Sequence, residues 1–105
     1  MFISPNVEKV YGFSPNEILE HGEDLWIGRI HPEDQMAVKA AFEHLLSDRQ
    51  DFDIEYRIQH KDGQWIWFHD RANIVEERTG QLHAYGVFSD ITDRKRMEEE
   101  LRESE

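Results

Sequence analysis

Residues 51–75 of this chain, DFDIEYRIQHKDGQWIWFHDRANIV, predict two neighbouring strands joined by a tight turn. Residues 52–58 alternate apolar and polar side chains with a period of two, which is typical of a strand with one buried face. KDG at 61–63 is a hairpin signal, and the second strand begins directly after it. A further turn, RTG at 78–80, precedes QLHAYGVFSDI, which predicts a third strand. The C-terminal half is therefore expected to be an antiparallel meander.

The second strand carries large apolar side chains on both of its faces, at Trp65, Ile66, Trp67 and Phe68. One face can be covered by a helix of the same domain. The other face needs cover from a neighbouring segment or from another chain. This pattern favours a homodimer, with Trp65 as a candidate contact.

The N-terminal half predicts two short helices. Asn6 is placed to cap a first helical turn, which Gly12 ends. Ser14 and Glu17 have the spacing of a capping box for a second helix, and Gly22 is expected to stop it.

A longer amphipathic helix is predicted over residues 32–47, entered through His31. Its apolar positions follow the spacing of one buried stripe, so the helix is expected to lie on the sheet. The stripe comprises Val38, Ala41, Phe42, Leu45 and Leu46.

Composition narrows the class of protein. The 105 residues suit one domain, and an aromatic fraction of 11% favours a folded chain. Twelve Lys and Arg against 23 Asp and Glu give a net charge of −11, which disfavours binding to nucleic acid or to a membrane surface. The chain has no cysteine, which removes disulfides and thiolate chemistry and fits a cytoplasmic location. No membrane-spanning run is present in the sequence.

Four stretches, in this order, resemble the PAS domain family in the subgroup with a C-terminal PAC motif: SPNVEKVYGFSPNEIL at 4–19, HPED at 31–34, IEYRIQHKDGQWIWF at 54–68 and GVFSDITDRKRMEEEL at 86–101. The resemblance implies an α+β fold, with an antiparallel sheet of up to five strands and helices on one face around a small cavity. It also implies a non-catalytic sensory input or dimerisation module of a larger signalling protein, commonly a histidine kinase, a diguanylate cyclase or a chemoreceptor.

The resemblance divides the chain into a sensor domain at residues 1–91 and the start of a C-terminal connector helix at 92–105, with an output domain downstream. In the family, a further strand precedes the FISPN strand and pairs with the last strand. Nothing precedes Met1 here, so either the sequence begins late or another chain supplies that strand, because two unpaired inner edges would promote association.

The cavity between helix and sheet is the candidate ligand site. Its expected lining residues are Phe42, Tyr56, Trp67 and Tyr85, with Arg57 as a charged partner if its face turns inward. An unidentified small organic molecule or an anion would suit such a cavity. The alternative is a core filled by these aromatic side chains, which would make the domain a constitutive dimerisation module.

The sequence gives little support for the cofactors that some PAS domains bind. Heme would need a histidine on the long helix, but His44 falls about 130° from the centre of its apolar stripe and is expected at the surface. Covalent flavin attachment needs a cysteine. The six histidines lack a ligand pair at helical i, i+4 spacing, so no metal site is predicted. No catalytic motif appears, and the chain is not expected to be an enzyme.

Asp90, Ile91 and Thr92 join the last strand to the terminal helix. Asp90 or Thr92 can cap this helix, and Ile91 can anchor the joint. The resemblance implies that signals leave the domain through this junction. Met97 and Leu101 are the two large apolar residues of the helix, four positions apart, and are candidate connector or dimer contacts.

Overall fold

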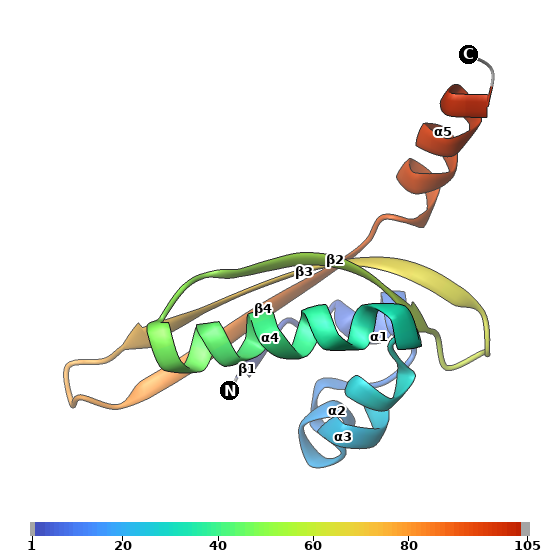
Figure 1. The fold of residues 1–105 in the computed structure, drawn as a ribbon. Coiled ribbons are helices and arrows are strands. Elements are labelled where there is room, and N and C mark those ends of the chain that lie inside the picture. Colours follow the sequence, from blue (N-terminus) through green and yellow to red (C-terminus); the bar gives the residue numbers. More distant parts are fainter. Residues whose placement is uncertain (1, 104–105) are drawn as a thin grey trace.

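A four-stranded sheet in the order β1-β4-β3-β2 forms the centre of the computed structural model, which describes residues 2–103 (Figure 1). The neighbours β2 and β3, and β3 and β4, are antiparallel, which confirms the predicted meander. The tight turns between them contain Gly63 and Gly80, whose φ angles of 94° and 84° are left-handed and suit glycine. The strands are β1 Phe2–Ile3, β2 Phe52–Gln59, β3 Trp65–Glu76 and β4 Leu82–Asp90.

The short strand β1 runs parallel to β4, with Phe2 opposite Tyr85 and Ile3 opposite Gly86. The Ser4 N–H continues the pairing by donating to the Gly86 carbonyl oxygen at 3.0 Å. The resemblance had implied a different strand beside the last one, and two unpaired inner edges without it. In the structure, β1 occupies part of the β4 edge that was expected to be unpaired.

Helices cover one face of the sheet, as expected (Figure 1). The longest, α4, packs mainly against β2 and also contacts β3, while α1 packs against β4. The helical elements are α1 Val7–Tyr11, α2 Pro15–Glu20, α3 Gly22–Leu25, a 3₁₀ turn at Ile27–Arg29, and α4 Pro32–Asp48. The core between these helices and the sheet includes the fully buried side chains of Val7, Tyr11, Ile30, Val38, Leu45, Tyr56, Ile58 and Phe68.

The helix ends only partly follow the expected signals. Ser14 and Glu17 form the predicted capping box, since each side chain accepts from the other's backbone N–H. Asn6 makes no capping hydrogen bond; its side-chain amide instead donates to the Phe88 carbonyl oxygen at 3.3 Å, which ties α1 to β4. Gly22 was expected to stop the second helix, but α2 already ends at Glu20, and Gly22 is the first residue of α3.

The apolar stripe of α4 is narrower than predicted. Val38 and Leu45 are fully buried, and Ala41 and Phe42 pack against the core as partly buried residues. Leu46, which was expected in the stripe, has 54% of its surface exposed. The reason is geometric, since each residue turns the helix by about 100° and Leu46 lies one full step beyond Leu45.

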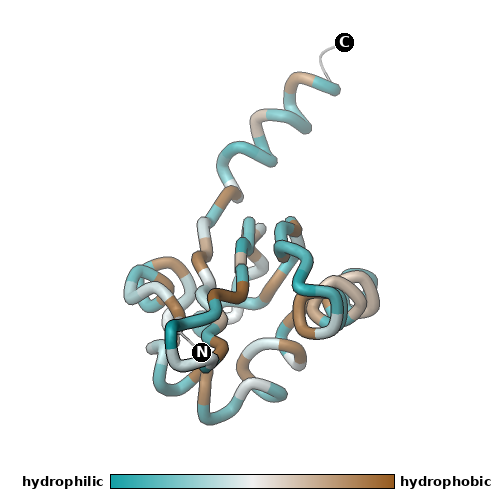
Figure 2. The backbone as a smooth tube through the Cα atoms, turned by 90° about the vertical axis from the view of Figure 1, so that its left-hand side faces the viewer, coloured by the Kyte–Doolittle hydropathy of each residue, from teal (hydrophilic) through white to brown (hydrophobic). Residues whose placement is uncertain are grey.

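The central strand β3 uses both of its faces. Ile66 and Phe68 are buried toward the helices, whereas Trp65 and Trp67 alternate onto the outer face. The terminal helix α5, Thr92–Glu103, begins beside this outer face and then projects away from the sheet (Figure 1). Figure 2 shows that this helix is mostly hydrophilic. A neighbouring segment of the same chain therefore supplies part of the outer cover that the sequence required.

Candidate functional site

A pocket of about 450 Å³ lies between helices α2 to α4 and the sheet, near the β1 and β4 strands. Its volume distinguishes it from a filled core. Most of its lining residues are aromatic or aliphatic, and Asp70 is also among them. Charged side chains from α3 and α4 also border it. The lining comprises Ile3, Ile18, Leu19, Gly22, Glu23, Trp26, Ile27, Lys39, Phe42, Glu43, Phe52, Asp70, Ala72, Ala84, Tyr85, Gly86 and Phe88.

Asp70 is the buried acid among the described residues, with 3% of its surface exposed. Its Oδ2 accepts a 2.7 Å hydrogen bond from the Tyr56 hydroxyl, which in turn accepts a 2.8 Å hydrogen bond from Trp26 Nε1. Burial raises the pKa of Asp70 from 3.8 to about 7, although the hydrogen bond from Tyr56 acts in the opposite direction. Burial also raises the pKa of Tyr56 well above 10.0, so its hydroxyl keeps its proton.

The predicted cavity residues separate into two groups. Phe42 and Tyr85 line the pocket, while the fully buried Tyr56 lies behind its wall and reaches it through Asp70. Arg57 and Trp67 occupy the opposite face of the sheet, where they are cross-strand partners. Alternation along β2 explains the split, because Tyr56 and Arg57 are adjacent and must point to opposite faces. The face of Arg57 therefore does not turn inward.

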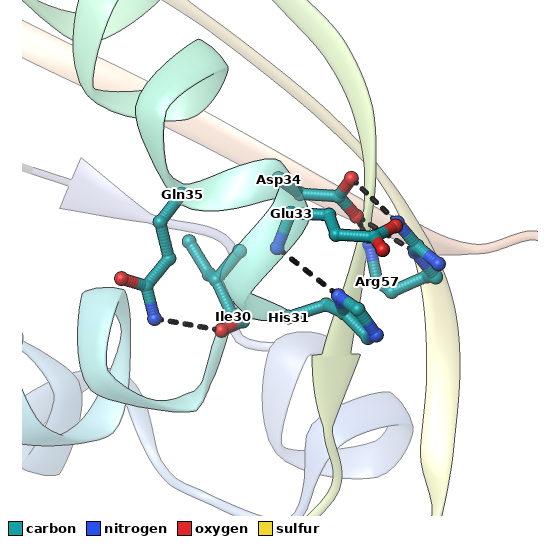
Figure 3. Close-up of polar contacts among 6 residues, drawn as sticks. All are labelled: Ile30, His31, Glu33, Asp34, Gln35 and Arg57. Carbon is teal, nitrogen blue, oxygen red and sulfur yellow. Dashed lines mark hydrogen bonds and ion pairs between the residues drawn. The ribbon is translucent and has the colours of Figure 1, made fainter.

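Arg57 instead clamps the start of α4 to β2 (Figure 3). Asp34 Oδ2 accepts from the Arg57 backbone N–H at 2.9 Å and from its Nε at 3.0 Å, and Asp34 Oδ1 accepts from Nη2 at 2.9 Å. Glu33, which is more exposed, accepts a further hydrogen bond from Arg57 Nη2 at 3.2 Å. The hydrogen bonds from Arg57 lower the pKa of Asp34, and those to Asp34 raise the pKa of Arg57. The HPED motif thus has a structural role in this domain.

The junction between β4 and α5 is a small hydrogen-bond network. Asp90 Oδ1 accepts from the Thr92 backbone N–H at 2.9 Å and also from the Thr92 hydroxyl. Thr92 Oγ1 accepts from the Trp67 N–H at 3.0 Å, and the Ile91 N–H donates to the Trp67 carbonyl oxygen at 2.9 Å. The start of α5 is therefore held against the backbone of Trp67 in β3 by Ile91 and Thr92, and Asp90 holds Thr92 in place.

Polar contacts also fix the base of α5 on the sheet. Glu55 of β2 forms ion pairs with Arg94 and, at 2.8 Å, with Lys95. The Lys95 ammonium lies 4.7 Å from the Trp67 ring centroid, a distance at which cation–π attraction operates. Arg57 approaches the same ring at 5.5 Å. Met97 and Leu101 lie farther along the helix and are 63% and 66% exposed.

The histidines form no metal centre within residues 2–103, where no group of three His, Cys, Asp or Glu side chains could hold an ion. His44 lies on the surface of α4 as its position predicts, paired with Asp48 at 2.9 Å and 60% exposed. His31 precedes α4 and accepts from the Glu33 N–H at 3.2 Å (Figure 3). In the same described part of the chain, no helix has the length and apolar character needed to cross a membrane.

The sheet topology, the pocket under α4 and the helix leaving β4 together define a PAS-type sensory domain. The PAS fold family matches residues 1–88, and the chain belongs to that family. A solved sensory box histidine kinase/response regulator from Burkholderia thailandensis is similar, with 33% identity, a TM-score of 0.70 and coverage of 96% of this chain and 75% of that one.

Further relatives are also sensor proteins. The N-terminal domain of a diguanylate cyclase with PAS/PAC sensor from Marinobacter aquaeolei is 26% identical, with a TM-score of 0.66 and coverage of 88% of this chain and 84% of that one. The sensor protein FixL of Bradyrhizobium diazoefficiens is 29% identical over 78% of this chain. The chain spans only 16% of FixL and between 10% and 16% of the curated relatives that it matches. It therefore corresponds to the PAS module of such proteins, which is non-catalytic.

Asp70 and Trp26 were not predicted as site residues. A signal for Asp70 was present, because positions 66, 68, 70 and 72 share the inward face of β3 and only position 70 carries a charge. Trp26 gave no comparable signal, since it lies between two short helical elements whose path the sequence pattern did not predict.

We expect the stability of the domain to fall as pH rises from 5 to 8 because Asp70 ionises. Its pKa is raised in the folded state, so its contribution is fully present below 3.8 and is lost as pH rises through about 7. In the wild type, ionisation of Asp70 should lower the free energy of unfolding by about 3 kcal/mol between pH 5 and pH 8, and Asp70→Asn should abolish this decrease. Urea unfolding at both pH values measures it. The exposed Asp51→Asn variant is the control and should keep the wild-type slope. Equal pH dependence in wild type and Asp70→Asn would contradict the assignment.

Proposed function

We propose that this PAS domain is the sensory input module of a larger signalling protein, and that it responds to a small molecule bound in the pocket. The pocket of about 450 Å³ is the observation that carries the proposal. Its volume lies within the range of small-molecule sites, and it combines apolar walls with one buried polar group. The alternative, a filled core in a purely structural module, leaves this volume without a role.

The pocket and the junction use the same pair of strands, which supports a relay between them. Asp70 and Phe88 are cross-strand partners in the pocket wall, and Phe88 lies two residues before Asp90. Phe68 is the cross-strand partner of Asp90, and its ring centroid lies 5.4 Å from that of Phe88. A ligand that displaces Phe88 would therefore shift the strand ends on which Ile91 and Thr92 are held, and α5 would respond.

We propose that α5 is the connector to an output domain, in a histidine kinase or a diguanylate cyclase located in the cytoplasm. The similar solved domains come from proteins of these two kinds. A helix of 12 residues is marginal in isolation, so the contacts at its base, and continuation into a further segment, would stabilise it.

Blocking the pocket should abolish ligand capture. Ala84 is partly buried in the pocket lining, so Ala84→Phe should fill the space without opening the core. Native mass spectrometry of the purified chain, combined with thermal shifts across metabolite classes, should detect a ligand for wild type but not for Ala84→Phe. The control is Ala37→Phe on the exposed side of α4. A ligand that bound both variants equally would lie outside this pocket, and complete absence of ligand would favour the filled-core alternative.

Breaking the junction should separate sensing from output. Thr92→Val removes the hydroxyl that accepts from Trp67 and donates to Asp90, whereas Thr92→Ser keeps it. In the full-length protein, Thr92→Val should lose most of the stimulus-dependent change in output and retain the wild-type circular dichroism spectrum. Thr92→Ser should behave like wild type. A normal stimulus response from Thr92→Val would disprove the relay.

We also propose that the domain forms a homodimer through the outer face of the sheet and α5. Trp65 and Val87 on that face are 48% and 51% exposed, and Met97 and Leu101 are exposed apolar side chains on α5. Met97→Glu should therefore weaken dimerisation in sedimentation equilibrium. Met36→Glu, on the exposed side of α4, is the matched control and should have no effect. A wild-type chain that sediments as a monomer at every concentration tested would contradict this proposal.

A further inference from the structure

Asp70 offers the pocket a carboxylate oxygen that the protein itself does not use. Its Oδ2 accepts from Tyr56, and no hydrogen bond from a described residue reaches Oδ1. No buried side-chain oxygen of the described residues lacks a partner, so Oδ1 must be accessible rather than enclosed by the protein. Asp70 lines the pocket, so a ligand inside it can reach this oxygen. We infer that the pocket takes an organic cation, with an aromatic or branched apolar body and one ammonium group that donates to Asp70. This inference rests on the proposed function and adds the chemical class of the ligand.

The buried acid has no protein counter-ion. Its hydrogen-bond partner is the neutral Tyr56 phenol, and among the described residues no Lys or Arg side chain forms an ion pair with it. Buried charges in proteins are normally paired, because an isolated ion loses its hydration without compensation. An ammonium group would supply the missing partner. A neutral hydroxyl could also donate to Oδ1, but a charge-assisted hydrogen bond is about twice as strong.

The surroundings of the pocket favour a cation over an anion. Its charged lining residues are Asp70, Glu23 and Glu43 against the single cation Lys39. The whole chain adds a net charge of −11, which repels anionic ligands. The anion considered from the sequence depended on Arg57, which lies on the other face of the sheet.

Aromatic walls suit the apolar body of such a ligand. Trp26 stands edge-on to Phe42 at a centroid distance of 5.2 Å and to Phe52 at 6.4 Å, and all three line the pocket with Phe88. A flat apolar ring of a ligand packs well among such side chains. The ring faces of the pocket side chains also attract an adjacent ammonium group.

Three probes with one indole frame test the class directly: tryptamine, tryptophol and indole-3-acetate carry an ammonium, a hydroxyl and a carboxylate. Isothermal titration calorimetry on the purified chain should show tryptamine binding about tenfold more tightly than tryptophol. Indole-3-acetate should not bind. Tryptamine binding that is equal to or weaker than tryptophol binding would overturn the inference.

Asp70→Asn should weaken tryptamine at least about tenfold and remove its advantage over tryptophol. Asp51→Asn, which removes an exposed carboxylate outside the pocket lining, is the control and should keep the wild-type affinity. Loss of tryptamine binding in Asp70→Asn could also follow from a disturbed pocket, so tryptophol binding by the same variant is required. Unchanged tryptamine affinity in Asp70→Asn would overturn the inference.

The affinity for tryptamine should also fall about tenfold between pH 8 and pH 6. Asp70 has a pKa of about 7 in the unliganded domain, and the ammonium binds its ionised form. An alkylammonium stays charged over this range. The other titratable groups that face Asp70 or line the pocket are Tyr56 from β2, Glu23 from α3, Lys39 and Glu43 from α4, and Tyr85 from β4. No histidine is among the described residues that line the pocket.

Failure of this inference can be distinguished from failure of the proposed function. If none of the three probes binds, the ammonium class is rejected, whereas the unbiased capture experiment with Ala84→Phe still decides whether the pocket holds a ligand. If only tryptophol or indole-3-acetate binds, in a manner blocked by Ala84→Phe, the pocket is a ligand site of a different chemical class.

Discussion

The hydrogen-bond chain from Trp26 through Tyr56 to Asp70 is the constraint on which the interior depends. A carboxyl group that is 3% exposed must be satisfied, and the phenol satisfies one of its oxygens. The same chain ties the segment between α3 and the 3₁₀ turn to β2 and β3. Because this segment forms part of the pocket wall, the bond network that stabilises the acid also shapes the cavity beside it.

A second constraint starts one residue later, at Arg57. Its three hydrogen bonds to Asp34 place the start of α4 over β2, while the adjacent Tyr56 points to the core. Neighbouring residues of one strand thus hold the two layers together from opposite faces, which follows from the period of two. Charge-assisted bonds in a partly buried setting resist screening better than exposed ion pairs do, so this clamp is expected to be stronger than the Glu33 contact.

The arrangement of pocket and junction on β3 and β4 gives the proposed relay a short physical path. Asp70 and Phe88 line the cavity, and Phe68 and Asp90 are the cross-strand pair two residues farther along the same ladder. Trp67 holds the start of α5 with its backbone and carries Lys95 against its ring. A packed strand pair transmits small displacements because close-packed side chains have little free space to absorb them.

Local patterns in the sequence were sufficient for most of the elements and for the family, but not for α3 and the 3₁₀ turn. Alternation in residues 52–58, the turns at Gly63 and Gly80, the Ser14 and Glu17 capping box and the helix after His31 depend on near neighbours, so their chemistry is visible in the chain itself. The pairing of β1 with β4, the contact of Arg57 with Asp34, the Asn6 contact to Phe88 and the pocket at Asp70 depend on residues far apart in sequence. Only the tertiary structure decided these, because a side chain's partner is set by which elements pack together, and a period of two or 3.6 does not specify that.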